Sequence, residues 1–310
     1  MDCRGDLLPA EYAAHAGIEP FPRIEYVAMK RLIWAVIPAL LASAGALPAQ
    51  LSPPNSSGVA MGHLHYTVKD VDANRKFWIA LGGRPVRFGT AEVLKFPDTL
   101  VFLSRGESSA GTEGSVVNHV AFRIESLARL EAAGMKVEYN RDYPGVASVF
   151  SPEGERIELF DATATNLTFT PDDGRDDPVA RRHNRKITVP IVAHHIHMYV
   201  PEGSELRAKF WYAATFGGLP GKRWRYEAVD LPGININFSA APQALAPIKG
   251  RRLDHIGFEI GNLEAFCKKL LASGVKLDMP YTKQPSGIAS AFLTDPWGTY
   301  IELTEGLNRL

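Results

Sequence analysis

The chain has 310 residues, 34 basic and 34 acidic side chains, and 45% hydrophobic residues. This length allows two globular domains of roughly 100–150 residues each. The formal net charge of zero gives no electrostatic basis for binding nucleic acid or an anionic membrane surface, so we expect neither partner.

The N-terminal region is predicted to carry a targeting segment. Basic residues follow Met29, an apolar stretch comes next, and small residues suited to cleavage end it at Ala46 or Ala49. This pattern is typical of a signal peptide over residues 29–49, with an uncleaved signal anchor as the alternative. We therefore expect a periplasmic or secreted protein that keeps no membrane span after cleavage. Residues 1–28 show no repeat or periodicity and are interpreted as an upstream extension of the reading frame.

Removal of this leader leaves one cysteine, Cys267, which excludes an intrachain disulfide bond. Cys267 falls in an amphipathic helical pattern over residues 263–271, and we expect it to be a small buried hydrophobic residue.

The first of two internal repeats joins a predicted strand to a predicted helix. Residues 63–83 and 195–218 share His-x-His, then Val, an acidic residue, Lys-Phe-Trp and a closing Gly-Gly. The glycines are a usual stop for a helix, and the histidines open the preceding strand.

The second repeat begins with a histidine and ends with a glutamate. Residues 118–134 parallel residues 254–274, and each opens with Asn-His or Asp-His. Residues 150–159 then parallel residues 293–303, where a turn containing Pro and Gly leads into an Ile-Glu-Leu strand.

Four βαβββ modules in an α+β fold follow from these repeats. We expect two tandem domains with concave mixed sheets, residues 59–163 and residues 190–310, each built from two modules around a cleft. Residues 164–189 read as a solvated, charged linker, and His183 within it is discounted. The sequence leaves open whether the first module pairs with the second or with the fourth.

Seven of the nine histidines lie at the openings of the four strand-like segments, and two segments are followed by a matching glutamate. Neutral imidazoles combined with a carboxylate are ligands that a divalent metal requires. The repetition predicts two metal sites in one chain.

The chain resembles the vicinal oxygen chelate superfamily, which includes glyoxalase I, extradiol dioxygenases and bleomycin-resistance proteins. The resemblance rests on the two His-x-His strands, Asn118-His119, Asp254-His255 and the two Ile-Glu-Leu strands, and it covers nearly all of the chain after the leader. It implies the fold more strongly than the reaction, because this fold supports many chemistries.

The resemblance also implies which residues hold the metals, since family members place ligands on the first and last strands of their modules. Carried over by position, the N-terminal site consists of His63, His119 and Glu158. The corresponding C-terminal site consists of His195, His255 and Glu302, with Asn237 as a possible extra ligand.

His65 and His197 each lie two residues beyond a proposed ligand and so face the same side of the strand. We expect them to support the ligands or face the substrate as catalytic residues, with direct ligation as the alternative. His194 is expected to point to the opposite face. Arg123, four residues after His119, is a candidate anchor for a substrate carboxylate, with a surface arginine as the alternative.

A site of two histidines and one carboxylate with open positions is associated with non-heme Fe(II) oxygenases, so Fe(II) or Mn(II) is favoured over Zn, Ni or Co. Phe102 stands where glyoxalase-like members carry a fourth ligand. Phe292 stands where extradiol dioxygenases carry a tyrosine. The named reactions of both subfamilies therefore fit imperfectly.

The sequence favours an exported metal-dependent enzyme, dioxygenase-like or isomerase- or lyase-like, acting on a small oxygen-chelating substrate. The alternatives are a glyoxalase I-like lyase, a non-catalytic small-molecule-binding protein of the bleomycin-resistance type, and a chain with one active and one retired domain. A monomer or a homodimer is expected.

Overall fold

The computed structural model describes residues 51–165 and 167–310, and these fall within one compact unit. The predicted signal peptide at residues 29–49 and the predicted extension at residues 1–28 lie outside the described residues.

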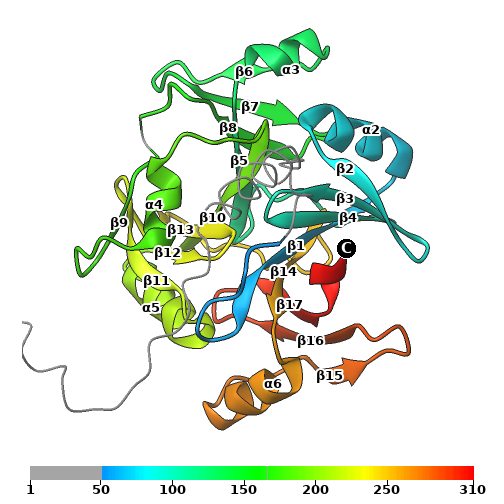
Figure 1. Ribbon diagram of the computed structural model, residues 1–310, viewed down its shortest axis with the longest axis vertical. Coiled ribbons are helices and arrows are strands. Elements are labelled where there is room, and N and C mark those ends of the chain that lie inside the picture. Colours follow the sequence, from blue (N-terminus) through cyan, green and yellow to red (C-terminus); the bar gives the residue numbers. More distant parts are fainter. Residues whose placement is uncertain (1–50, 166) are drawn as a thin grey trace, which may run out of the picture. The chain divides into compact units, whose positions relative to one another are not determined.

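Four βαβββ modules follow one another along the described chain, as the repeats predict (Figure 1). The first contains β1 (Val59–Val68), α2 (Val71–Leu81), β2 (Arg84–Phe88), β3 (Ala91–Phe96) and β4 (Thr99–Arg105). The second contains β5 (Val117–Ile124), α3 (Ala128–Ala132), β6 (Glu138–Tyr139), β7 (Val146–Phe150) and β8 (Arg156–Phe160). The third contains β10 (Ile191–Pro201), α5 (Glu205–Phe216), β11 (Leu219–Arg223), β12 (Tyr226–Leu231) and β13 (Ile234–Ala241). The fourth contains β14 (Leu253–Ile260), α6 (Leu263–Ala272), β15 (Met279–Lys283), β16 (Ala289–Thr294) and β17 (Tyr300–Glu305).

Local signals fix the ends of the helices. The side chain of Asp70 accepts a hydrogen bond from the backbone N–H of Ala73 at 2.9 Å and so caps the start of α2. Asn262 caps α6 in the same way through Ala265 at 3.0 Å. Gly217 ends α5 with a φ of 70°, a left-handed conformation that favours glycine.

The modules pair across the sequence rather than in consecutive order. Within the described residues, β1 of the first module runs antiparallel to β14 of the fourth at the centre of an eight-stranded sheet. In the other sheet, which has nine strands, β5 of the second module runs antiparallel to β10 of the third. The expected grouping of consecutive modules into residues 59–163 and residues 190–310 is therefore corrected: each sheet combines one module from each range.

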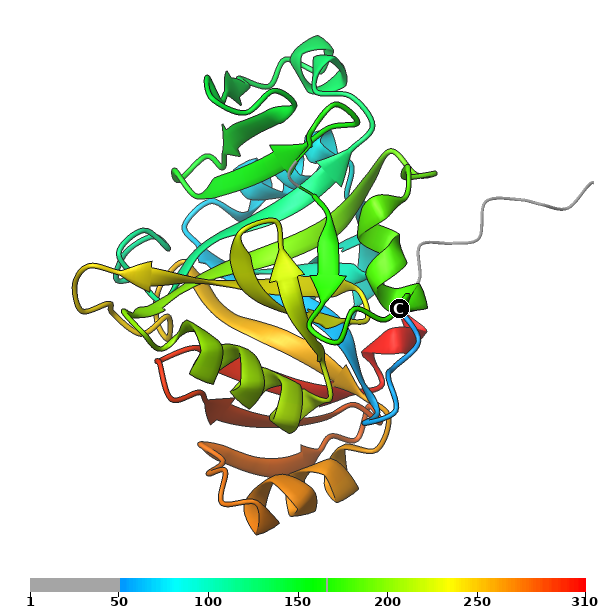
Figure 2. The same ribbon diagram turned by 90° about the vertical axis from the view of Figure 1, so that its left-hand side faces the viewer.

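Consecutive modules meet instead through a shared hydrophobic core between the sheets. In Figure 2 the yellow-green helix α5 lies beside the orange and red strands of the other sheet. The ring of Trp78 on α2 lies 6.1 Å from that of Phe122 on β5. On the other side, Phe216 on α5 lies 4.8 Å from Phe258 on β14. A helix from one sheet thus covers strands of the other, and this buries the outer faces of both sheets in one core.

The segment expected to be a solvated linker contributes to the fold. Residues Phe169–Pro171 form β9, which pairs with β11 at the edge of the nine-stranded sheet. Residues Pro178–Asn184 form α4, and His183 within it is only 3% exposed. The prediction that His183 lies in solvent is therefore wrong, because α4 packs its inner face against this sheet.

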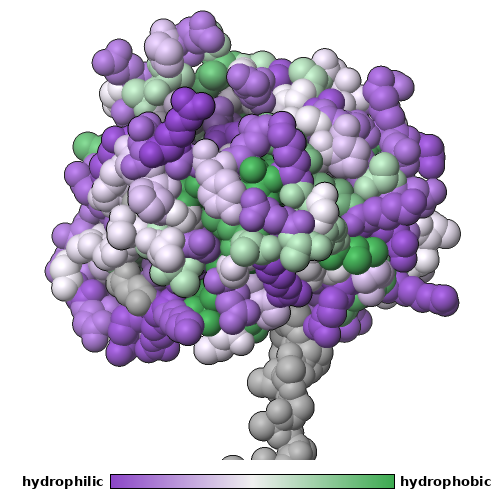
Figure 3. All heavy atoms as spheres, turned by 90° about the horizontal axis from the view of Figure 1, so that it is seen from above, coloured by the Kyte–Doolittle hydropathy of each residue, from purple (hydrophilic) through white to green (hydrophobic). Residues whose placement is uncertain are grey.

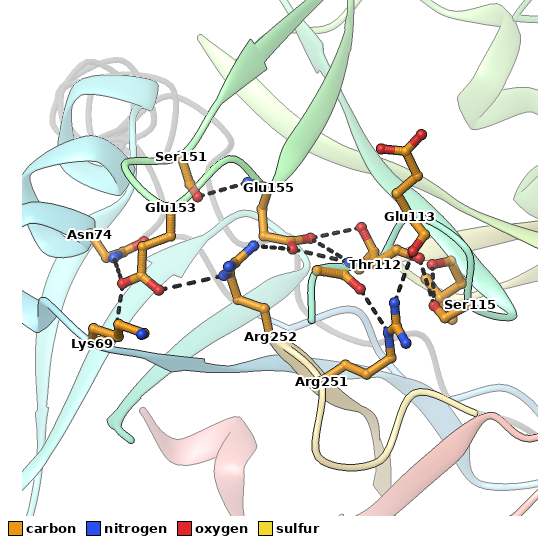
Figure 4. A network of polar contacts seen from close by, with 12 residues as sticks. Lys69, Asn74, Thr112, Glu113, Ser115, Ser151, Glu153, Glu155, Arg251 and Arg252 are labelled. Carbon is orange, nitrogen blue, oxygen red and sulfur yellow. Dashed lines mark hydrogen bonds and ion pairs between the residues drawn. The ribbon is translucent and has the colours of Figure 1, made fainter. Parts of the chain in front are cut away.

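A polar network joins the two sheets where the loop before β14 meets the turn between β7 and β8 (Figure 4). Arg252 contacts Glu155 at 2.9 Å and Glu153 at 3.4 Å. The carboxylate of Glu155 also accepts hydrogen bonds from the backbone N–H and the hydroxyl of Thr112. Glu153 accepts hydrogen bonds from the backbone N–H of Lys69, so four segments of the chain converge here.

Hydrophilic residues cover much of the face seen from above, and apolar residues show between them in small groups (Figure 3). Among residues 51–165 and 167–310, none of the helices has the length and apolar character needed to span a bilayer.

Removing the Arg252 side chain should destabilise the fold. Glu155 is 3% exposed, and Arg252→Ala leaves its carboxylate without a charged partner. We expect the free energy of unfolding, measured by urea denaturation, to fall by about 3 kcal/mol or more. Lys69→Ala is the control, because its side chain pairs with Glu107 in solvent and its loss should leave the free energy of unfolding almost unchanged. Equal effects of the two substitutions would contradict the role of this network.

Candidate metal sites

The paired central strands bring histidines and glutamates together in two clusters. Site I consists of His63, His65, His255 and Glu302, and their ligand atoms lie within 4.8 Å of one another. Site II consists of His119, His195 and His197, which meet the same distance limit, together with the neighbouring Glu158.

All of the predicted ligands are found in these clusters, but in different sets from those expected. His63 and His65 come from β1, His255 from β14 and Glu302 from β17. His119 therefore does not join His63, and His255 does not join His195. The predicted N-terminal and C-terminal sets are wrong because the sheets combine modules across the two halves of the chain.

Successive side chains of a strand point to opposite faces of the sheet, and the site I ligands lie on the face away from the hydrophobic core. On β14 the side chain of Ile256 belongs to the hydrophobic core, and that of its neighbour His255 points to the other face of the sheet. Ile301 and Glu302 are related in the same way on β17. Because β14 and β17 are adjacent and parallel, two ligands from separate segments reach one point.

One carboxylate oxygen is the centre of site I. Oε2 of Glu302 lies 2.9 Å from Nε2 of His63 and 3.0 Å from Nε2 of His255. Burial opposes the charge of Glu302, but hydrogen bonds with these two imidazoles outweigh it and hold the pKa of the carboxyl well below its usual range. Nδ1 of His63 is buried and has no hydrogen-bond partner within the described part of the chain.

Gly257 makes room for the His63 ring. These two residues are direct partners in the β1–β14 register. A Cβ atom at position 257 would lie only 2.0 Å from the imidazole of His63, so a larger residue here would displace the ligand.

β-Bulges supply a hydrogen-bond partner to one histidine in each site. The register between β1 and β14 skips Asp254, and Oδ1 of Asp254 lies 2.6 Å from Nδ1 of His255. The register between β10 and β5 skips Asn118 in the same way, and Oδ1 of Asn118 accepts a hydrogen bond from His119 at 2.8 Å. In the Asp-His and Asn-His pairs of the sequence, the first residue therefore orients the imidazole of the second through a hydrogen bond.

A second bulge corrects the expected direction of His194. The register between β10 and β5 also skips His194, so the alternation of side chains is interrupted there. Nδ1 of His194 consequently lies 2.8 Å from Nδ1 of His195, and both rings pack against Phe160. The prediction that His194 turns to the opposite face is wrong for this reason.

His65 and His197 occupy equivalent places beside the two clusters. Nε2 of His65 hydrogen-bonds with the hydroxyl of Ser104 at 2.7 Å, and Nε2 of His197 does so with Ser239 at 2.8 Å. Burial, followed by the neighbouring His255 and His63, lowers the pKa of His65 to about 3. Its imidazole is therefore neutral at physiological pH.

Asn237 and Arg123 are engaged elsewhere. Oδ1 of Asn237 accepts a hydrogen bond from Nε of Arg223 at 3.1 Å, so this oxygen faces a cation. The guanidinium of Arg123 donates to the backbone oxygens of Arg182 and His183 in the last turn of α4. Arg123 thus interacts favourably with the C-terminal end of a helix and lines a cavity of about 230 Å³ beside α4.

The two sites differ in charge at equivalent positions. Site I has apolar side chains where β2 ends and in the middle of β4, and its Phe88 and Phe102 rings pack at 6.0 Å. Site II has Arg223 and Asn237 at the corresponding places. Two residues before its glutamate, site I has Tyr300, whereas site II has Arg156.

These differences make site I the better cation site. Burial opposes the charge of Glu158, but His119 and the guanidinium groups of Arg156 and Arg223 outweigh it and lower the pKa of this carboxyl. Arg223 is 1% exposed, and burial lowers its pKa to about 10, so it stays a cation. A buried cation beside the ligands repels a divalent metal, whereas site I carries two carboxylates, those of Asp254 and Glu302.

Tyr300 and Ser104 of site I were not predicted from the sequence. Phe292, noted as a replacement for a tyrosine, has its ring 5.4 Å from that of His255, and Tyr300 lies 5.9 Å from the same ring. The serine partner of His65 at position 104 has no motif of its own, but the equivalent serine at position 239 is a signal that comparison of the repeats could have found.

The family model of the Glyoxalase/Bleomycin resistance protein/Dioxygenase superfamily matches residues 60–303. The chain therefore belongs to this superfamily, the vicinal oxygen chelate group that its motifs resemble. No curated protein sequence matches the chain.

Solved structures with a similar fold include glyoxalase I from Zea mays, which is 15% identical with a TM-score of 0.57. That match covers 81% of this chain and 94% of the maize protein. A proposed dioxygenase from Bacillus subtilis subsp. subtilis strain 168 is 12% identical with a TM-score of 0.55, and the match covers 83% and 86% of the two chains. At these identities the likeness establishes the α+β fold with its two mixed sheets.

In the metal-free protein, His255 should titrate above its ordinary value of 6.5. Burial would lower its pKa, but hydrogen bonds with Asp254 and Glu302 outweigh burial and raise it. The stability that protonated His255 contributes is therefore fully present below pH 6.5 and is lost as the pH rises through the higher pKa of the folded state. Asp254→Asn should lower this pKa and shrink the loss of stability, measured by histidine NMR titration and by urea denaturation across this pH range. An unchanged pKa in the variant would contradict the assigned partner.

Proposed function

We propose that the protein is a metal-dependent enzyme of the vicinal oxygen chelate superfamily, with site I as its metal centre, acting on a small oxygen-chelating substrate. One observation carries the proposal: Nε2 of His63 and Nε2 of His255 both lie within hydrogen-bond distance of the same oxygen of Glu302. The three residues come from three different strands, β1, β14 and β17. Three such ligands leave coordination positions open for a substrate.

The residues of site I fit a divalent ion, with Fe(II) or Mn(II) favoured and Zn, Ni or Co as alternatives. Asp254 accepts a hydrogen bond from the N–H at Nδ1 of His255, which directs the Nε2 lone pair toward Glu302 and the metal position. When bound, the metal would act as a Lewis acid that binds and polarises two oxygens of the substrate.

The chain's own side chains would shape the reaction around that ion. Phe102 packs 5.1 Å from the His63 ring and, together with Phe88, keeps water from one side of the site. His65 is neutral and lies 4.6 Å from the His255 ring, so it is placed beside the metal position to orient a bound substrate by a hydrogen bond. Phe292 offers no hydroxyl group to the site, which separates this arrangement from an extradiol dioxygenase with a tyrosine there.

Metal analysis of the full chain tests the proposal. After anaerobic loading with Fe(II) or Mn(II), one ion should bind tightly at site I and a second more weakly at site II, where Arg223 and Arg156 oppose it. His63→Ala should abolish the tight ion and His195→Ala only the weak one, measured by elemental analysis after dialysis against a chelator. Less than one ion per chain in the unmodified protein would refute the metal-dependent enzyme and favour a metal-free binding protein of the bleomycin-resistance type.

A methyl group under His63 should weaken the metal site without removing a ligand. Gly257→Ala places the methyl 2.0 Å from the His63 ring, and we expect the metal affinity of site I to fall about 10-fold to 100-fold. Gly261→Ala is the matched control, because a Cβ there would come no closer than 3.8 Å to its nearest neighbour, the backbone oxygen of Gly58. Retained affinity in the first variant would show that Gly257 does not set the position of His63.

A substrate screen on the loaded protein should decide between the reaction types. Oxygen uptake with small vicinal diols would indicate a dioxygenase, whereas conversion of a 2-oxoaldehyde with glutathione would indicate a glyoxalase I-like lyase. With either substrate, His65→Asn should lower turnover by about 100-fold while the metal stays bound, because the substrate loses the imidazole that orients it. Unchanged turnover would remove His65 from the reaction.

We also propose that the protein is exported and acts in the periplasm or outside the cell, on the strength of the signal pattern at residues 29–49. Cell fractionation and N-terminal sequencing of the mature protein test this. A protein that keeps residues 29–49 and stays in the cytoplasm would refute it.

A further inference from the structure

A continuous chain of buried side chains leads from Asp230 to site II. Oδ1 of Asp230 lies 2.6 Å from Nε2 of His183, and Nδ1 of His183 lies 3.3 Å from Nε2 of His194. Nδ1 of His194 then lies 2.8 Å from Nδ1 of His195, whose Nε2 faces Glu158 at 3.5 Å. We call these four residues, Asp230, His183, His194 and His195, the histidine relay.

Asp230 fixes the acceptor end of the relay. Its side chain is fully buried and paired with Arg182 at 2.9 Å, and Asn235 donates a further hydrogen bond at 2.8 Å. Burial opposes its charge, but Arg182 and His183 outweigh burial and lower the pKa of Asp230 to about 2. The ionised carboxylate can therefore only accept a hydrogen bond, so Nε2 of His183 must be the donor.

The remaining hydrogen bonds follow from this one. A neutral imidazole has one N–H donor and one acceptor nitrogen. When Nε2 of His183 donates to Asp230, its Nδ1 must accept from Nε2 of His194. Nδ1 of His194 then accepts from Nδ1 of His195, and Nε2 of His195 is left with its lone pair directed at the site.

Burial keeps the three imidazoles neutral, as this order of hydrogen bonds requires. His183, His194 and His195 are each at most 3% exposed, so a charged imidazolium at any of these places would be removed from water. Nε2 of His195 is also buried without a hydrogen-bond partner in the described part of the chain. A lone pair that faces a carboxylate oxygen needs a cation or a proton donor between the two.

Site I has no such relay. Gly62 takes the place of His194 at the equivalent bulge of β1, and Lys95 takes the place of Asp230 in the register of β3 and β4. Nδ1 of His63, the counterpart of His195, has no hydrogen-bond partner among the described residues. The relay is therefore a feature that one site has and its repeat lacks.

We infer that the histidine relay is a positioning device that fixes His195 with its proton on Nδ1, so that Nε2 is presented to site II as a ligand atom. Orienting hydrogen bonds of this kind strengthen metal ligands. The relay offsets part of the repulsion from Arg223 and lets a second ion bind where the local charge disfavours it. The expected effect on the metal affinity of site II rests on the proposed function, whereas the expected tautomer of His195 does not.

NMR of the metal-free full chain, labelled with ¹⁵N-histidine, tests the tautomer directly. We expect His195 to carry its proton on Nδ1 in the unmodified protein. His194→Phe keeps a ring against Phe160 but removes both nitrogens, so His195 should then populate both tautomers. Asp230→Asn should have the same effect with less change in shape. Ser239→Ala, which alters only the partner of His197, is the control and should leave His195 unchanged.

Metal affinity gives the second readout. His194→Phe should weaken the ion at site II by about 10-fold to 100-fold and leave site I unchanged, measured by competition with a chelator. A proton on Nε2 of His195 in the unmodified protein would overturn the inference, as would an unaltered tautomer in both relay variants. If no metal binds at either site, the proposed function fails, but the NMR result still decides the relay.

Discussion

The antiparallel pairing of first strands is the constraint on which both sites depend. Where β1 meets β14, His65 lies directly opposite His255, and where β10 meets β5, His197 lies directly opposite His119. Directly opposed residues in an antiparallel pair have neighbouring side chains, so each pairing sets two imidazoles side by side. The parallel strand on the far side of β14 or β5 then supplies the glutamate.

The bulges in these pairs refine the same arrangement. An extra residue in one strand turns a side chain toward the neighbour it would otherwise avoid, and at three of the bulges that side chain belongs to Asp254, Asn118 or His194. Each of them contacts Nδ1 of the next histidine in the chain. The fourth bulge falls at Gly62, which has no side chain, and the ring of His63 lacks this support.

Duplication of one framework has produced two sites with different chemical character. Site I combines the carboxylates of Asp254 and Glu302 with an apolar wall formed by two phenylalanines. Site II keeps the imidazoles but surrounds its glutamate with guanidinium groups, and it alone is joined to a buried carboxylate through His194 and His183. The common fold therefore determines where ligands stand, and the side chains one position away determine which ion or molecule they suit.

The sequence by itself determined the four βαβββ modules, because the period of the apolar residues, the helix caps and the turn residues are local signals. It also identified each ligand type, since a histidine lies on the first strand of every module and a glutamate on the last strand of the second and the fourth. Only the tertiary structure decided which ligands share a site, because pairing between modules depends on the packing of Trp78 against Phe122 and its counterparts in the shared core. The direction of His194 was likewise decided there, because a bulge interrupts the alternation that a strand pattern implies. The burial of His183 was decided by the packing of α4 against the sheet.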